Sequence, residues 1–96
     1  MRNVIRTMDG FHFGSVGPAN AKQALFKVNP GVDAAVALEQ LATRLDVVAE
    51  LVFDAGMGEK PLEGNHAWLA HYTLESISAA LFSIAAGLDA AQGGEQ

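Results

Sequence analysis

The fold is decided by residues 34–55, which read AAVALEQLATRLDVVAELVFDA. Their apolar side chains recur at alternating steps of four and three residues, which is the spacing of the a and d positions of a heptad repeat. This spacing places the side chains on one stripe of an α-helix. The stripe consists of Ala34, Leu38, Leu41, Leu45, Val48, Val52 and Ala55.

A second stretch repeats the pattern over residues 67–88. Gly56, Gly64 and a proline lie between the two stretches and favour a turn. We therefore predict an all-α fold built on an antiparallel two-helix hairpin, with helices at about 31–55 and 65–92. The second stripe consists of Ala67, Ala70, Leu74, Ile77, Leu81, Ile84 and Leu88.

The second helix is apolar on nearly all sides, so a two-helix layer would leave most of its surface in water. A second copy of the chain is the simplest cover, because closed two-fold symmetry is the commonest form of oligomer. We expect a homodimer in which two hairpins form a four-helix bundle. The predicted core and dimer seam comprises Leu38, Leu41, Leu45, Val48, Val52, Leu74, Ile77, Leu81, Ile84 and Leu88.

Residues 1–28 form an N-terminal arm with a less regular pattern. The pair Asp9-Gly10 favours a tight hairpin turn, and residues 25–28 alternate as an extended segment does. Two alternatives remain open for the arm, a flexible segment and a short strand or hairpin, because an isolated two-stranded hairpin is marginal in water. The helical hairpin is predicted at 29–93 and a frayed tail at 94–96.

Two residues can cap the first helix. Asn29 stands before a proline that suits the first helical position, and Asp33 stands directly before the apolar stripe. These signals place the start of the helix at residues 30–34. At the other end, Gly56 and the nearby Gly58 offer the left-handed residue that commonly closes a helix.

The composition is that of one folded domain, with 50% hydrophobic and 18% charged residues and no cysteine. The lack of cysteine favours a reducing compartment, and the first residues do not resemble an export signal, so we expect a cytoplasmic location. The longest run without charge, residues 76–88, is shorter than the roughly 20 residues of a membrane-spanning helix. We expect no membrane span.

The net charge of −5 is unevenly divided, with +3 on residues 1–28 and −8 on residues 29–96. Binding of nucleic-acid phosphates requires clustered Lys and Arg, and a duplex would repel the acidic helices. We therefore expect no nucleic-acid partner.

The sequence carries no catalytic, metal or nucleotide signature. His66 and His71 are five residues apart, about 140° around a helix, unlike the i, i+4 pair of a zinc protease. Glu63 and His66 have the spacing found in di-iron bundles, but that site requires a second such pair and two more glutamates. We expect no cofactor, no bound metal and no enzyme activity. The alternative is an enzyme or metal-binding protein whose site is assembled across the dimer from His66, His71 and the acids.

Three aromatic residues of the second helix, Trp68, Tyr72 and Phe82, lie outside its apolar stripe. Either the N-terminal arm folds over them or they form an exposed patch for a partner protein, since aromatic side chains are common interface anchors. They are the candidate partner surface.

Three segments resemble a family of short bacterial proteins catalogued as a domain of unknown function. They are Phe26-Lys27-Val28-Asn29-Pro30-Gly31-Val32, Ala37-Leu38-Glu39-Gln40-Leu41 and Ala67-Trp68-Leu69-Ala70-His71-Tyr72. The resemblance covers roughly residues 26–85 and implies a two-helix unit without catalytic residues. Together with the patterns above, it leads us to expect a non-catalytic, dimeric protein-interaction or regulatory module.

Overall fold

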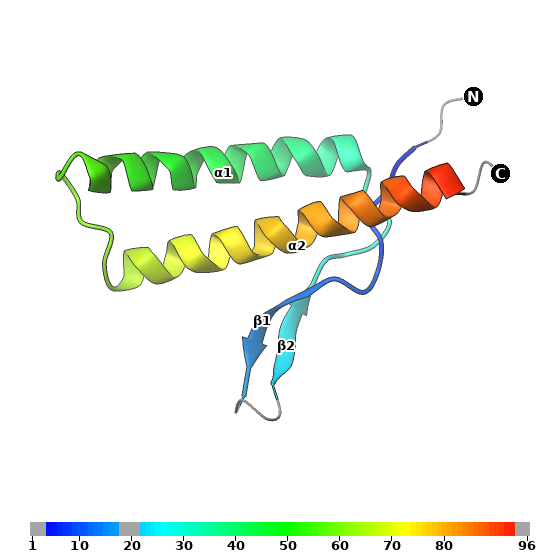
Figure 1. Ribbon diagram of the computed structural model, residues 1–96, viewed down its shortest axis with the longest axis horizontal. Helices are drawn as coiled ribbons and strands as arrows, with labels where there is room; N and C mark the ends of the chain where they lie inside the picture. The colour runs from blue at the N-terminus through cyan, green and yellow to red at the C-terminus, as the bar shows by residue number, and fades with distance from the viewer. Residues whose placement is uncertain (1–3, 18–21, 94–96) are drawn as a thin grey trace.

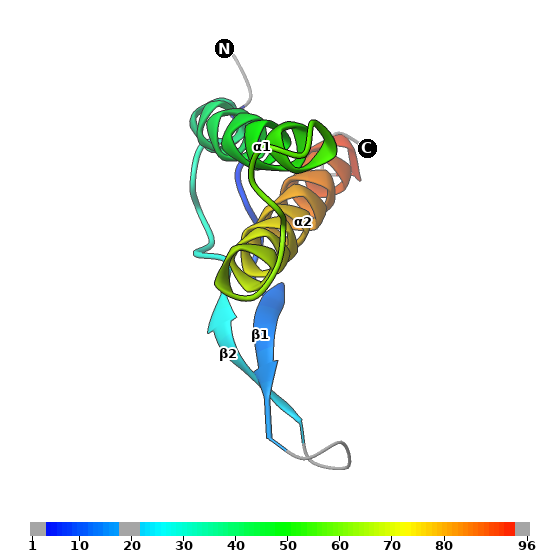
Figure 2. The same ribbon diagram turned by 90° about the vertical axis from the view of Figure 1, so that its left-hand side faces the viewer.

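The computed structural model describes residues 4–17 and 22–93. Helix α2 lies in the middle, with α1 along one side and a two-stranded antiparallel sheet along another (Figures 1 and 2). This position between two neighbours accounts for only part of the apolar surface of α2, since several of its large apolar side chains remain exposed. The elements are β1 (His12–Val16), β2 (Gln23–Lys27), α1 (Ala34–Gly56) and α2 (Asn65–Gly93).

The helical hairpin is confirmed, but the prediction of an all-α fold is wrong. β1 and β2 pair with His12 opposite Lys27, and β1 packs against α2, so the sheet is an integral part of the molecule. The pair Asp9-Gly10 is not the turn of this hairpin, which connects Val16 to Gln23. The predicted tail at 94–96 lies outside the described residues. A single chain does not show the four-helix bundle.

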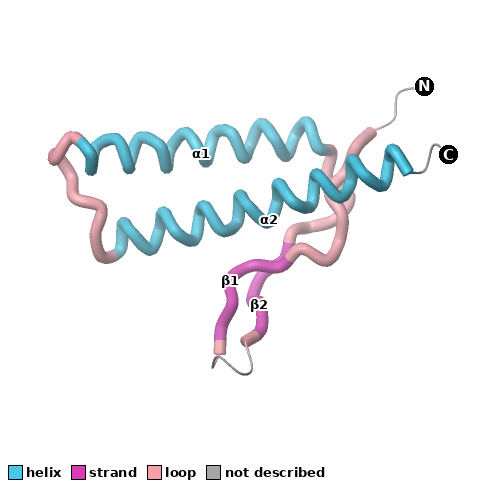
Figure 3. The backbone as a smooth tube through the Cα atoms, in the orientation of Figure 1, coloured by secondary structure: helices cyan, strands magenta, loops and turns pink. Residues whose placement is uncertain are grey.

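The pairing of the two N-terminal segments continues beyond the sheet toward α1 (Figure 3). The backbone N–H of Val28 donates to the carbonyl of Phe11 at 2.8 Å, and that of Ala34 donates to the carbonyl of Ile5 at 2.7 Å. Residues 5–16 therefore run antiparallel to residues 23–34 as one long ribbon, which we call the N-terminal ribbon. Its end lies at the start of α1.

Thr7 fixes the ribbon at this end. Its buried hydroxyl donates to the carbonyl of Asn29 at 2.7 Å and accepts from the N–H of Val32 at 2.9 Å. The N–H of Gly31 also donates to the carbonyl of Thr7. Together, these bonds hold the turn at Pro30-Gly31 against Thr7. The direction in which the chain enters α1 is thereby set.

The ends of α1 distinguish between the predicted signals. Asp33 is the N-cap, and its carboxylate accepts from the N–H of Ala35 at 2.8 Å. Gly56 is the last helical residue, whereas Gly58 has a φ of +80° and donates its N–H to the carbonyl of Ala55. Gly58, and not Gly56, therefore provides the left-handed turn after the helix.

Residues 5–8 cross α2 in close contact, and we call them the strap. The completely buried hydroxyl of Ser83 accepts from the N–H of Met8 and donates to its carbonyl, both at 2.8 Å. One turn later, a Cβ built on Gly87 would overlap the carbonyl oxygen of Arg6. Ala79, Ser83 and Gly87 are spaced four apart, so small side chains on one face of α2 allow the strap backbone to lie directly on the helix.

Replacing Ser83 with alanine is expected to destabilise the protein by about 1–3 kcal/mol. The reason is that both backbone polar groups of Met8 would lose their partner where water has little access. Thermal unfolding followed by circular dichroism measures the effect. Ser78→Ala, on a side of the same helix that the strap does not contact, is the control; it removes no hydrogen bond to the strap and should change the midpoint little. Equal midpoints for the two variants would show that the strap is not held by Ser83.

Candidate protein-interaction surface

In the structure, the apolar stripe predicted for each helix separates into two columns of residues that are seven apart. In one column, Val48 of α1 and Ile77 of α2 are buried between the helices. In the other column of each helix, the large side chains remain between 41% and 49% exposed. The exposed columns consist of Leu38, Leu45 and Val52 on α1 and of Leu74, Leu81 and Leu88 on α2.

The two exposed columns lie on the same side of the helix pair. Leu45 from α1 and Leu74 and Leu81 from α2 line one groove of about 560 Å³. Phe82 lines the same groove, and no charged side chain does. We call the surface formed by the six exposed column residues the leucine face.

The three aromatic residues of the candidate partner surface are exposed, between 56% and 64%. Trp68 and Tyr72 stack with their ring centroids 5.8 Å apart. Phe82 lies about 21 Å along the helix axis from Trp68. The N-terminal ribbon lines grooves with Tyr72 and Phe82, yet all three aromatic side chains remain exposed. Their role as a partner surface stays a prediction.

The sheet forms two grooves with α2 that sequence reasoning missed. Phe13 stacks on Phe26 across the strands at 5.5 Å, and both line a groove with Tyr72. Phe13 also lines a second groove, with Phe11 and Phe82. The alternation around Phe26 was visible in the sequence, but without the partner strand it gave no position relative to α2.

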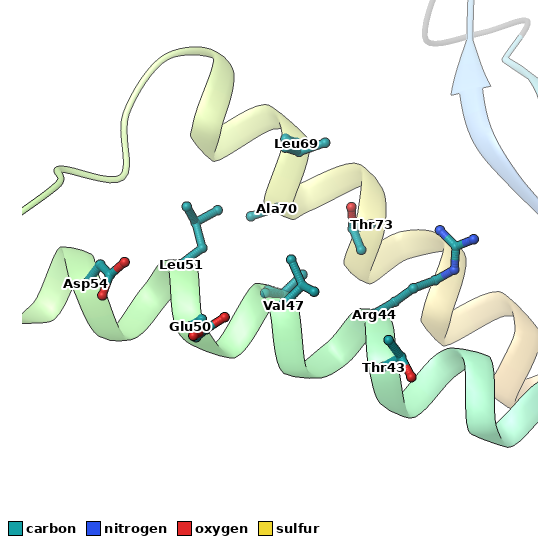
Figure 4. A pocket seen from close by; sticks show the side chains of 10 residues that line it. Thr43, Arg44, Val47, Glu50, Leu51, Asp54, Leu69, Ala70 and Thr73 are labelled. Carbon is teal, nitrogen blue, oxygen red and sulfur yellow. The ribbon is translucent and has the colours of Figure 1, made fainter.

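A different groove, of about 500 Å³, lies between α1 and α2 away from the leucine face. Figure 4 shows Arg44, Val47 and Leu51 reaching from α1 toward α2 at this groove. Glu50 and Asp54 stand on the α1 side and make its rim charged. Charged side chains therefore line this groove, whereas none lines the groove at the leucine face.

The ribbon carries one ion pair among the described residues, between Lys27 and Asp9 at 3.4 Å. The backbone N–H of Gly10 and the ammonium group of Lys27 both hold the pKa of the Asp9 carboxyl below its usual range. The pair is exposed, so its contribution to stability is small.

The histidines considered for metal binding lie on α2 without a set of ligands. His71 has its ring 5.5 Å from that of Tyr72 and 6.0 Å from that of Trp68. His66 is exposed in the first turn. In the part of the chain that the structure describes, no three His, Asp or Glu side chains are grouped so that they could hold a metal ion.

Helix α2 is long and apolar enough, by length and composition alone, to cross a membrane. The mean hydropathy of its most apolar segment is 1.3. This finding is weak, because core helices of soluble proteins meet the same criterion. The expectations of no membrane span and of a cytoplasmic location stay predictions.

A family model described as "Protein of unknown function (DUF3077)" matches residues 7–85. The chain belongs to the DUF3077 family. The prediction of a family of unknown function is thus confirmed, and the match begins earlier than the predicted resemblance at residue 26. The DUF3077 match includes both strands, Thr7 and the bonds between Met8 and Ser83, whereas Arg6 and Gly87 lie just outside it. Comparisons with curated proteins and with solved structures found no match.

Proposed function

We propose that this chain is a non-catalytic protein-interaction module that works as a homodimer. The observation that carries the proposal is the amount of surface that the single chain exposes. Its accessible area is 7145 Å², about 1,900 Å² more than the roughly 5,300 Å² typical of a folded monomer of 10.1 kDa. Much of the exposed side-chain surface belongs to large apolar residues. A surface of this size and chemistry is typical of an interface.

The shape supports the same proposal. The radius of gyration is 16.3 Å, against about 12.5 Å for a compact domain of this length. The molecule measures 53 × 35 × 16 Å. A molecule this thin encloses only a small core, so many of its apolar side chains need a partner.

A lipid bilayer is the other environment that would suit an apolar α2. The strap argues against it, since its irregular backbone lies directly on the helix at Ser83. The sheet, with open edges, packs on the same helix. Unpaired backbone groups and sheet edges are not tolerated against lipid chains. A protein partner therefore fits this fold better.

The alternative of an enzyme or metal-binding protein, with a site built across the dimer, stays a hypothesis. No arrangement of His66, His71 and the acids among the described residues favours it. Metal analysis of protein purified without a histidine tag tests it directly. Stoichiometric metal would support this alternative over a non-catalytic module.

The homodimer is tested by light scattering after size exclusion at micromolar concentration. We expect a mass of twice 10.1 kDa, because one chain leaves its apolar surface uncovered. A clean monomer under these conditions would contradict the proposal.

A further inference from the structure

The leucine face has the chemistry of the centre of an interface. The groove between its columns is lined by Leu45, Leu74, Ile77, Leu81 and Phe82 together with two small residues, and it has no charge. Interface centres are depleted of charged residues and enriched in aromatic and apolar ones. The leucine face matches this composition.

The opposite face of the helix pair does not match it. Val47 follows Leu45 by two residues, so the two side chains point about 160° apart around α1. The groove that Val47 lines also holds Arg44, Glu50 and Asp54. Burying these charges would carry a desolvation penalty that the leucine face avoids.

The leucine face also continues onto the sheet. Leu74, Ser78 and Phe82 line both the groove between the helices and the groove between α2 and β1. The second groove contains Phe11 and Phe13. Polar side chains at its edge are His12, His71 and Glu75. The apolar residues therefore continue from α1 across α2 to Phe11 and Phe13, so a partner that covers the leucine face is in reach of β1.

The excess surface area fits a second copy as the occupant. An excess of about 1,900 Å² on each of two chains corresponds to about 3,700 Å² in total, inside the range of about 2,000–5,000 Å² found for obligate dimers. A self-complementary face repeated by a two-fold axis gives a closed assembly. A two-stranded sheet is marginal on its own, and contact with the second copy supplies the cover that it lacks.

From these observations we infer that a second copy of this chain packs on the leucine face around a two-fold axis and contacts β1 as well as both helices. This inference rests on the proposed homodimer and adds the location of its interface. The face with Arg44, Glu50 and Asp54 stays in solvent in this dimer. Phe82, at the junction of the two grooves, is buried by the second copy, whereas Trp68 and Tyr72 lie near the end of α2.

The first test compares Leu81→Lys with Val47→Lys by light scattering over a dilution series. Leu81→Lys should raise the dissociation constant at least about 30-fold, equivalent to about 2 kcal/mol, because a charge enters the interface. Val47→Lys, whose side chain is 62% exposed on the opposite face, should leave the constant unchanged. Circular dichroism confirms that both variants are folded.

The second test does not depend on a disruptive change and uses the absence of cysteine from the chain. The thiol of Ser78→Cys should react with a maleimide more slowly at micromolar concentration than below the dissociation constant from the first test, where the copies have separated. The thiol of Val47→Cys should react equally fast at both. Both native residues are exposed in the single chain.

The outcomes separate the inference from the proposed function. A monomer at micromolar concentration would overturn both. A dimer in which Ser78→Cys reacts equally at both concentrations, or in which Val47→Lys dissociates the copies and Leu81→Lys does not, would leave the homodimer standing and overturn this interface.

Discussion

Gly87→Ala is expected to lower the stability of the protein by about 3 kcal/mol. The new methyl group would overlap the carbonyl oxygen of Arg6, and this atom belongs to the backbone and cannot rotate away. Moving the strap would also break the bonds between Met8 and Ser83. For a chain of this length we expect the melting temperature to fall by roughly 12–24 °C.

Gly56→Ala is the matched control for this substitution. Gly56 is also helical, but a Cβ built there meets no atom within 4 Å. Alanine is a better helix former than glycine by about 1 kcal/mol, so the control should be neutral or slightly stabilising. Both variants must be compared at one protein concentration because dimerisation shifts the melting temperature. Stabilisation by both substitutions would show that the strap does not lie on Gly87.

Ile77→Ala is expected to destabilise the fold by about 2–5 kcal/mol. Ile77 is buried between α1 and α2, so the smaller side chain leaves a cavity in the small core of the molecule. Urea unfolding measured at one fixed concentration gives the free energy of unfolding of each variant.

Val47→Ala serves as the comparison, since Val47 is largely exposed on α1 and should contribute little to the core. Similar free energies for the two variants would contradict the packing of the hairpin. Leu45→Ala adds information about assembly. Leu45 is exposed in the single chain. A large decrease in the free energy of unfolding of Leu45→Ala, which increases with protein concentration, is therefore expected only if a second copy covers this side chain.

The helices were predictable because their signals are local. A regular heptad pattern, an N-cap at Asp33 and a glycine-containing connection all act over a few residues. The sheet was not predictable in the same way. Each strand has five residues, and β2 is exposed along its whole length, so neither has the strong alternation of a half-buried strand.

The turn signal at Asp9-Gly10 was real but was assigned to the wrong structure. Gly10 has a φ of +103°, which suits glycine, and it lies between the strap and β1. A local pattern indicates that the chain bends, but it does not indicate which segment the chain pairs with after the bend. The pairing of 12–16 with 23–27 depends on residues on both sides of the connection.

The candidate surface was predictable in its residues and not in its arrangement. The heptad pattern identified both columns of each helix, but it does not say which column faces the neighbouring helix. That choice depends on the angle between α1 and α2 and on the strap, which occupies the side of α2 with Ser83 and Gly87. Long-range contacts of this kind have no signature in a single sequence.

The contact between the strap and α2 has a consequence for the order of events during synthesis. Met8 and Ser83 are 75 residues apart in the chain, whereas the contacts between the two helices are closer in sequence. Distant contacts form more slowly because a longer loop must close. On the ribosome, the ribbon emerges before the helix on which it rests, and it is too small to be stable alone. The ribbon is therefore synthesised before α2 but is among the last parts of this fold to reach its native contacts.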